Sequence, residues 1–140
     1  MEQNAEWITL KNIASIEVRV GDINYGGHMG NDKALLVFHD ARLRFLETFG
    51  FSEKNIGGPG IIMRDAHLAF RKEVFLHDLL QVDVGIEDVT ATSFNLIYTV
   101  KRENDGAIVF TGSTSLVAFD YDTRRVVRLP EAFLNKISIE

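Results

Sequence analysis

The sequence of 140 residues contains no cysteine. This absence excludes a disulfide framework, a thiolate zinc site and a cysteine nucleophile. Long apolar runs are also missing, because the run Ala34–Phe38 is short and is followed by charges, so we expect no membrane-spanning segment. Met1–Trp7 lacks the basic and apolar stretches of a secretory signal. Together these absences favour a cytoplasmic location.

An excess of positive charge is absent too. The formal net charge is −5, with a pI of about 5.4, which argues against a general nucleic-acid binder. A basic cluster at Arg124, Arg125 and Arg128 is interpreted as a solvated strand edge. The hydrophobic share of 46% is ordinary for a globular protein, and the length fits a single domain over residues 1–140 with its own core.

Hydrophobic periodicity divides the chain into a strand, a glycine-rich turn and a long helix. Asn12–Val20 alternates apolar and polar residues, which predicts a half-buried strand. Gly21–Gly30 holds four glycines, too many for a regular element. Apolar residues recur at three- and four-residue steps over Asn31–Phe49, which predicts a helix with Asn31 as N-cap and Gly50 as a left-handed stop.

The remainder of the chain is predicted to be mostly strand. The expected strands are Ile61–Phe75, Leu80–Glu87, Thr92–Lys101, Ile108–Phe119 and a short one around Val126–Arg128, before a terminal helix Glu131–Lys136. A lone amphipathic helix needs a sheet to cover its apolar face. The economical solution is an α+β fold in which an antiparallel sheet of five to six strands wraps around one long central helix.

The residues between the first strand and the helix resemble a known family. Residues 21–32 read Gly-Asp-Ile-Asn-Tyr-Gly-Gly-His-Met-Gly-Asn-Asp, and residues 39–42 read His-Asp-Ala-Arg. This resembles the 4-hydroxybenzoyl-CoA thioesterase branch of the hotdog superfamily, with its Asp-x-Asp, Gly-His-Val-x-Asn and acidic-Ala-Arg segments. Thr92–Phe94, Glu103–Gly106 and Leu129–Glu131 are similar to later family motifs, so the resemblance covers about residues 10–137.

The resemblance implies a hotdog fold and an acyl-CoA thioesterase, a hydrolase that needs no cofactor or metal. It implies a substrate of acyl-CoA or, less often, acyl carrier protein, with no nucleic acid or membrane as partner. It further implies a homodimer or homotetramer with the active site at the subunit interface. Two alternatives stay open: a hotdog hydratase or dehydratase acting on acyl thioesters, and a non-catalytic subunit that binds them.

Thioester hydrolysis requires a nucleophile or base, and a group that stabilises negative charge on the carbonyl oxygen. Unpaired N–H groups at a helix N-terminus meet the second requirement, so Gly30 and Asp32 are predicted to bind substrate through the backbone. A glycine-rich corner without any ligand is the structural alternative.

The catalytic base is predicted less directly. Asn24 stands where much of the family has an acidic residue, and Asp22 is the nearest carboxylate, although it could equally cap the turn. His28 carries an imidazole ring, the side chain that most often transfers protons in catalysis. Asp22, Asn24, His28 and Asn31 are therefore the candidate catalytic residues. Asp40 is expected to pair with Arg44 at the i+4 position rather than to act in catalysis.

Further residues are candidates for contacts with the substrate. Gly60 and Ile61, at the end of the Asn55–Gly60 loop, could line the acyl pocket, although core packing explains the apolar residues equally well. Arg71, with Lys72, could bind the phosphates of coenzyme A by charge-assisted hydrogen bonds, as could Arg124 and Arg125. His39, His67 and His77 lack the mutual spacing of metal ligands, and no metal is expected.

Overall fold

A computed structural model describes residues 7–139. The first half of the chain forms β1 (Leu10–Glu17), a short 3-10 helix (Val20–Asp22), α1 (Asn31–Thr48) and β2 (Gly60–Phe70). The second half forms β3 (Leu79–Glu87), β4 (Ser93–Arg102), β5 (Ile108–Asp120), β6 (Arg125–Val126) and α2 (Glu131–Ile137). In this part of the chain neither helix combines the length and the hydropathy that a membrane crossing requires.

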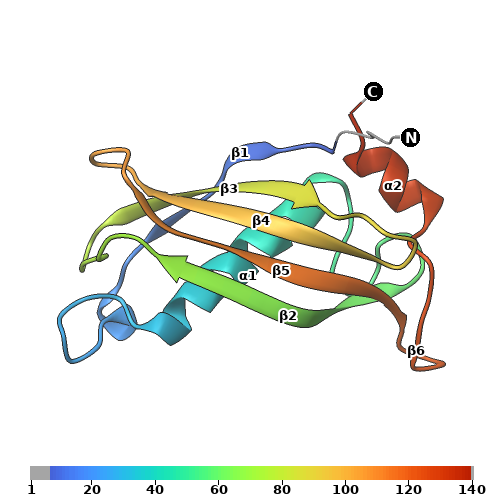
Figure 1. Cartoon of the computed structure of the whole chain (residues 1–140), viewed down its shortest axis with the longest axis horizontal. Helices are drawn as coiled ribbons and strands as arrows, with labels where there is room; N and C mark the ends of the chain where they lie inside the picture. Colours follow the sequence, from blue (N-terminus) through green and yellow to red (C-terminus); the bar gives the residue numbers. More distant parts are fainter. Residues whose placement is uncertain (1–6, 140) are drawn as a thin grey trace.

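The strands form one antiparallel sheet in the order β1-β3-β4-β5-β2, and β6 pairs with β5. Helix α1 runs obliquely behind the sheet, whose strands curve across it (Figure 1). This confirms the predicted α+β hotdog architecture, a sheet of five to six strands wrapped around a long helix. The glycine-rich loop before α1 projects at the end of the molecule where β2 finishes, while β6 and α2 lie at the other end (Figure 1).

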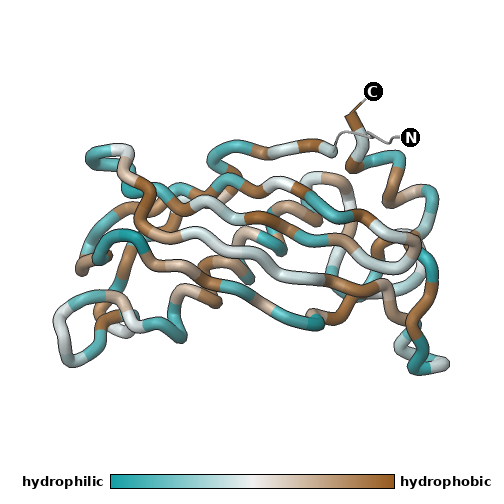
Figure 2. Tube along the Cα trace, in the orientation of Figure 1, coloured by the Kyte–Doolittle hydropathy of each residue, from teal (hydrophilic) through white to brown (hydrophobic). Residues whose placement is uncertain are grey.

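One face of α1 forms the centre of the core. Its buried residues recur at three- and four-residue steps, as expected for a helix packed on a sheet; they are Ala34, Val37, Phe38, Ala41, Arg42, Phe45 and Leu46. Hydrophobic segments recur along the strands that face this helix (Figure 2). Leu35 lies three residues before Phe38, a step that the sequence pattern assigns to the apolar stripe, but it is exposed because it lies on the outer side of the helix.

Helix α1 packs tightly against the sheet at Phe38. Its ring stacks on that of Tyr98 in β4, with centroids 4.3 Å apart and an interplanar angle of 10°. A Cβ atom built on Gly112 of β5 would lie 2.6 Å from the Phe38 ring and would also collide with the carbonyl oxygen of His67. Glycine at position 112 therefore lets the helix pack directly against the sheet.

The predicted end of the helix is confirmed and its predicted start is off by one residue. Gly50 has a φ of 81°, and the N–H groups of Gly50 and Phe51 donate to the carbonyl groups of Glu47 and Leu46. This is the Schellman pattern of helix termination. At the other end Asn31 is the first helical residue rather than the N-cap, because the extended residue before the helix is Gly30.

Two predicted strands are shorter than expected. β2 ends at Phe70 rather than Phe75, because the N–H groups of Arg71 and Lys72 both donate to the carbonyl oxygen of Val109 and the chain leaves the ladder. β1 ends at Glu17, and the chain then enters the 3-10 helix, which leaves Val20 79% exposed instead of on the core side. The other predicted strands and the terminal helix agree with the structure to within two residues at each end.

We expect Gly112→Ala to destabilise the fold by about 2 kcal/mol, the usual scale of overpacking a core. The added methyl group has no space between Phe38 and the β2 backbone. Urea denaturation would measure the free energy of unfolding. Gly21→Ala is the matched control, since a Cβ there meets no atom within 4 Å. Equal stability of the two variants would contradict the close packing of α1.

Candidate functional site

The loop before α1 is a small hairpin closed by backbone hydrogen bonds. The N–H of Asn24 donates to the carbonyl oxygen of His28 (3.0 Å), and the N–H of Gly27 donates to that of Asn24 (3.1 Å). At the base of the hairpin the N–H of Gly30 donates to the carbonyl oxygen of Asp22 (2.9 Å). Gly27, with a φ of 81°, makes the tight turn at the tip possible.

A further backbone bond ties this hairpin to the connection between β2 and β3. The N–H of Met29 donates to the carbonyl oxygen of Val74 over 2.8 Å. The connection is itself held to the sheet, because Arg102 of β4 donates from Nη1 to the carbonyl oxygen of Glu73 (3.0 Å). The hairpin and residues 73–74 are therefore adjacent in space although they are far apart in the sequence.

A hollow of about 280 Å³ lies between the hairpin, the start of α1 and this connection. Its lining residues are His28, Met29, Asn31, Phe70, Arg71, Lys72, Glu73 and Val74. It thus brings together two of the predicted catalytic residues, His28 and Asn31, with Arg71, a predicted substrate-binding residue. Apolar side chains line it together with the cationic residues Arg71 and Lys72, a combination that suits a ligand with an apolar part and anionic groups.

The first amides of α1 point to the same end of the molecule. The N–H groups of Asn31 and Asp32 have no hydrogen-bond acceptor among the described residues, as is usual in a first helical turn. The N–H of Gly30, which we also expected to be available, is occupied by Asp22. A Cβ atom on Gly30 would lie 2.8 Å from Oδ1 of Asp32, so the Asp32 carboxylate folds back over the turn and would have to move if position 30 carried a side chain.

The His28 ring is half-buried at the edge of the hollow. Its Nδ1 lies 3.5 Å from the carbonyl oxygen of Met29, and its Nε2 lies 3.8 Å from Oε2 of Glu73. Sequence reasoning missed Glu73, because residues 71–75 were predicted to continue the strand. The turn between the two strands brings this carboxylate to the hollow.

Asn24 and Asp22 are both engaged within the hairpin. Oδ1 of Asn24 accepts a hydrogen bond from the N–H of Gly26 (2.9 Å), and a Cβ atom built on Gly26 would lie 3.4 Å from it. The same Cβ position is 3.0 Å from Nε2 of His28, so the Asn24 amide and the imidazole lie on one side of Gly26. Oδ2 of Asp22 accepts from the N–H of Arg19 (2.9 Å), the turn-capping arrangement that was the alternative for this residue.

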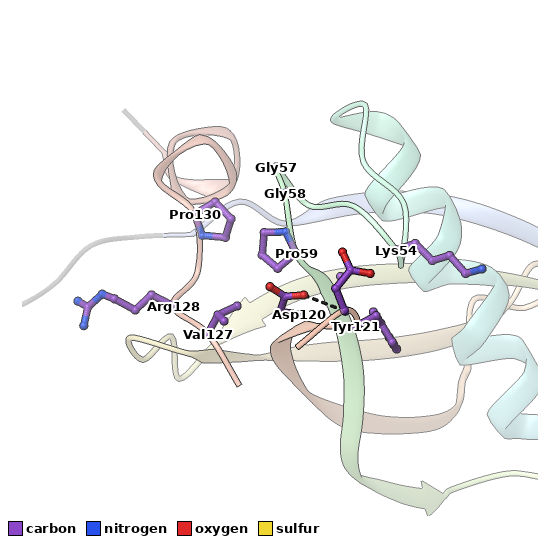
Figure 3. Close-up of a pocket in the computed structure, with 11 residues that line it drawn as sticks. Lys54, Gly57, Gly58, Pro59, Asp120, Tyr121, Val127, Arg128 and Pro130 are labelled. Carbon is purple, nitrogen blue, oxygen red and sulfur yellow. Dashed lines mark hydrogen bonds between the residues drawn. The ribbon is translucent and has the colours of Figure 1, made fainter. Parts of the chain in front are cut away.

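The other predicted substrate-binding residues lie at the opposite end of the sheet. Gly60 borders a second, open hollow of about 760 Å³, where Asp120 and Tyr121 lie beside the turn that contains Pro59, while the side chains of Lys54 and Arg128 point outward on opposite sides (Figure 3). Ile61 is buried beside it, and its carbonyl oxygen accepts a hydrogen bond from the Tyr121 hydroxyl group (2.7 Å). Within one chain, therefore, Gly60 and Ile61 do not meet His28.

A polar network runs from the core to the outer side of α1. Arg42, almost fully buried, donates from Nε to Oε2 of Glu53 (2.8 Å) and from Nη1 to the Tyr98 hydroxyl group (3.3 Å), which also bonds Thr114 (2.8 Å). Burial raises the pKa of the Glu53 carboxyl group, but hydrogen bonds from Arg42 and His39 outweigh burial and hold that pKa below its ordinary value. Glu53 is therefore a poor base and serves to neutralise the buried arginine.

Asp40 has the role that the sequence predicted for it. Its Oδ1 lies 2.6 Å from Nε of Arg44 on the exposed side of α1. The carboxylate and the guanidinium group are one helical turn apart, the spacing at which such pairs meet. The predicted ion pair is therefore confirmed, and Asp40 does not line the hollow that contains His28.

The described residues thus form a hotdog sheet around one long helix, with a hollow beside the N-terminus of that helix. The sequence profile of the thioesterase-like superfamily matches residues 18–137. The chain belongs to this superfamily. None of the curated proteins compared with it matches.

Solved structures show the same fold at low sequence identity. The 1,4-dihydroxy-2-naphthoyl-CoA thioesterase from Synechocystis is 20% identical, with 92% of this chain and 95% of that chain covered and a TM-score of 0.82. A hypothetical protein from Staphylococcus aureus, solved in complex with CoA, is 22% identical, with coverage of 97% and 84% and a TM-score of 0.80. A gentisyl-coenzyme A thioesterase is 18% identical, with coverage of 88% and 97% and a TM-score of 0.78.

We expect Gly26→Ala to displace the His28 ring, because the new methyl group would lie 3.0 Å from Nε2. The backbone of Gly26 lies outside the left-handed region, so the change should alter ligand binding or turnover more than stability. Calorimetry with free coenzyme A and thermal melting would measure the two effects. Gly21→Ala, where space is open, is the control. Unchanged binding and turnover would place His28 outside the site.

Proposed function

We propose that the protein is an acyl-CoA thioesterase whose active site is the hollow between the hairpin and α1. The observation that carries this proposal is the meeting of His28, the unbonded N–H groups of Asn31 and Asp32, and Arg71 at one end of the molecule. This arrangement supplies the groups that thioester hydrolysis requires: an imidazole that can act as a base, donors for a developing oxyanion and a cation for the ligand. The superfamily supports the reaction class.

In this mechanism His28 is the general base. Its imidazole takes a proton from water while the water oxygen attacks the thioester carbon. The negative charge that forms on the carbonyl oxygen is stabilised by the N–H groups at the start of α1, where the helix dipole is positive. The carbon–sulfur bond then breaks, the imidazolium returns its proton to the sulfur, and a carboxylic acid and a thiol leave.

The rest of the hollow fits the remainder of an acyl-CoA molecule. Arg71 and Lys72 are exposed at its rim, where their side chains can bind phosphates. Met29, Phe70 and Val74 provide an apolar surface for the acyl group. Structural relatives support coenzyme A as the carrier: one is described in complex with CoA, and others are described as thioesterases of aromatic acyl-CoA molecules.

We expect the wild-type protein to release thiol from at least one member of a panel of short, long and aromatic acyl-CoA molecules, measured with a thiol-trapping dye. His28→Gln should lower kcat by roughly 100-fold, the lower end for a positioned base. His77→Gln is the matched control, because His77 is an exposed histidine outside the hollow. If Asp22→Asn showed this loss in kcat and His28→Gln did not, the base would be Asp22 rather than His28.

The same panel separates thioesterase activity from the other candidate functions. Binding of acyl-CoA without thiol release by the wild type would favour a non-catalytic subunit. Loss of the conjugated absorbance of an enoyl-CoA without thiol release would favour a hydratase. Either result would contradict hydrolysis. Acyl carrier protein thioesters can be tested in the same assay, since they present the same bond to the hollow.

We also propose that the chain acts as a homodimer or a higher homo-oligomer that pairs across β2. Within the described residues β2 pairs with β5 along one edge and with no strand along the other. Met63 and Phe70 on β2 and Leu36 and Leu43 on the outer side of α1 are exposed apolar residues. A twofold axis across β2 would cover them and satisfy the open edge of the sheet.

This pairing also explains where Gly60 and Ile61 lie. In a two-fold pair of antiparallel β2 strands the beginning of one strand lies beside the end of the other. Gly60 and Ile61 of one copy would then approach Phe70 and the hollow of the second copy. The residues that lie apart within one chain would form one substrate site at the subunit interface.

We expect sedimentation velocity to show a dimer or larger species for the wild type. Leu36→Glu should shift it toward the monomer, because a twofold interface would bring carboxylates into an apolar contact. Val126→Glu, a change of the same kind at an exposed position on β6, should leave the mass unchanged. A monomeric wild type at micromolar concentration would contradict the interface.

A further inference from the structure

Glu73 is a carboxylate in the hollow that the mechanism above leaves without a role. Its side chain is 64% exposed, and its Oε2 lies 3.8 Å from Nε2 of His28, whose side chain is 35% exposed. Among the described residues no other side chain lies within ion-pair distance of this carboxylate. The two side chains come from connections that are 45 positions apart in the sequence, so their meeting is a property of the fold.

The backbone on both sides of this pair is held in place. Val74, next to Glu73, accepts the hydrogen bond from Met29, next to His28. The carbonyl group of Glu73 itself accepts from Arg102 (3.0 Å), whose Nη1 also lies 3.5 Å from Oδ2 of Asp78. Backbone bonds thus hold the two connections side by side, so that the imidazole and the carboxylate can meet at the hollow.

The other carboxylates near the hairpin are engaged elsewhere. Asp22 caps the backbone of Arg19, and Asp32 folds back over Gly30. Neither of them lines the hollow. At position 24 the family that this sequence resembles often has an acidic residue. Here the position holds an asparagine, which accepts a hydrogen bond from the N–H of Gly26. Among the described residues Glu73 is the acidic side chain that lines the hollow together with Asn31.

We propose that Glu73 and His28 together hold the water that attacks the thioester, so that Glu73 is a catalytic residue. This assignment rests on the proposed thioesterase function. A distance of 3.8 Å is too long for a direct hydrogen bond, but one water at about 2.8 Å from each atom fits between them. In this proposal the Nδ1 proton faces the carbonyl oxygen of Met29, 3.5 Å away, which can only accept, and Nε2 is the acceptor.

In this step one hydrogen of the water points to Nε2 and the other to the Glu73 carboxylate. Nε2 takes its proton as the oxygen–carbon bond forms, and the negative carboxylate beside it stabilises the imidazolium. When the carbon–sulfur bond breaks, that proton passes from Nε2 to the sulfur. The second hydrogen stays on the new carboxyl group, so one water and one thioester give one acid and one thiol.

The test compares Glu73→Gln and Glu73→Ala with Glu17→Gln. Glu17 forms the same kind of pair with His77, at 3.2 Å, but both lie outside the hollow, so its variant removes the same charge from a matched contact. We expect both Glu73 variants to lose roughly 100-fold in kcat with KM within about twofold, the pattern of a lost transition-state interaction. Added formate should restore part of the kcat of Glu73→Ala and leave Glu73→Gln and Glu17→Gln unchanged.

The outcomes separate this assignment from the proposed function. Thiol release by the wild type with a kcat of Glu73→Gln near the wild-type value would overturn the role of Glu73 and leave the thioesterase in place. Loss of activity in Glu73→Ala without rescue by formate, together with a lowered melting temperature, would make Glu73 structural and would also overturn it. A wild type that cleaves no thioester in the panel would overturn both.

Discussion

The position of α1 against the sheet depends on the contact between Phe38 and Gly112. Because Gly112 has no side chain, the Phe38 ring can occupy the space next to it, where it stacks on Tyr98. Arg42, one turn further along the same face, donates to the hydroxyl group of that tyrosine. The helix is therefore held along its axis by packing and in rotation by a buried hydrogen bond, and the place where its first amides emerge follows from both.

The hollow depends on a second set of constraints, which act on the backbone. The hairpin before α1 is closed by its own hydrogen bonds and is tied to Val74, and the connection that carries Val74 is tied to Arg102. These bonds leave the side chain of Glu73 exposed and that of His28 half-buried at the edge of the hollow. A rigid backbone with accessible polar side chains is the arrangement that a preorganised site needs, because no energy has to go into ordering the loop.

The architecture could be predicted from the sequence because it rests on local patterns: the apolar stripe of α1, the alternation in β3 and β4, and Gly50 as the helix stop. The site could be predicted only in part. His28 and Asn31 lie within the motif that resembles the family. Glu73 reaches the hollow through a turn, whereas the alternation of apolar and polar residues predicted that the strand continues through this position. The engagement of Asp22 with Arg19 depends on a 3-10 turn, and apolar alternation does not distinguish such a turn from a strand end.

If the proposed reaction holds, Asn24 is a position at which the motif changes while the reaction is retained. An amide cannot remove a proton from water, but Asn24 still accepts the hydrogen bond from Gly26 that shapes the hairpin. What the hairpin loses is negative charge beside the imidazole, and Glu73 supplies negative charge at that place from a different element. Because charge acts through distance and not through chain position, a carboxylate on the β2–β3 connection can stabilise the same imidazolium as one within the motif. Such a change of position requires only that the carboxylate lie near the imidazole. The hydrogen bond between Met29 and Val74 meets this requirement, because it brings the two connections together.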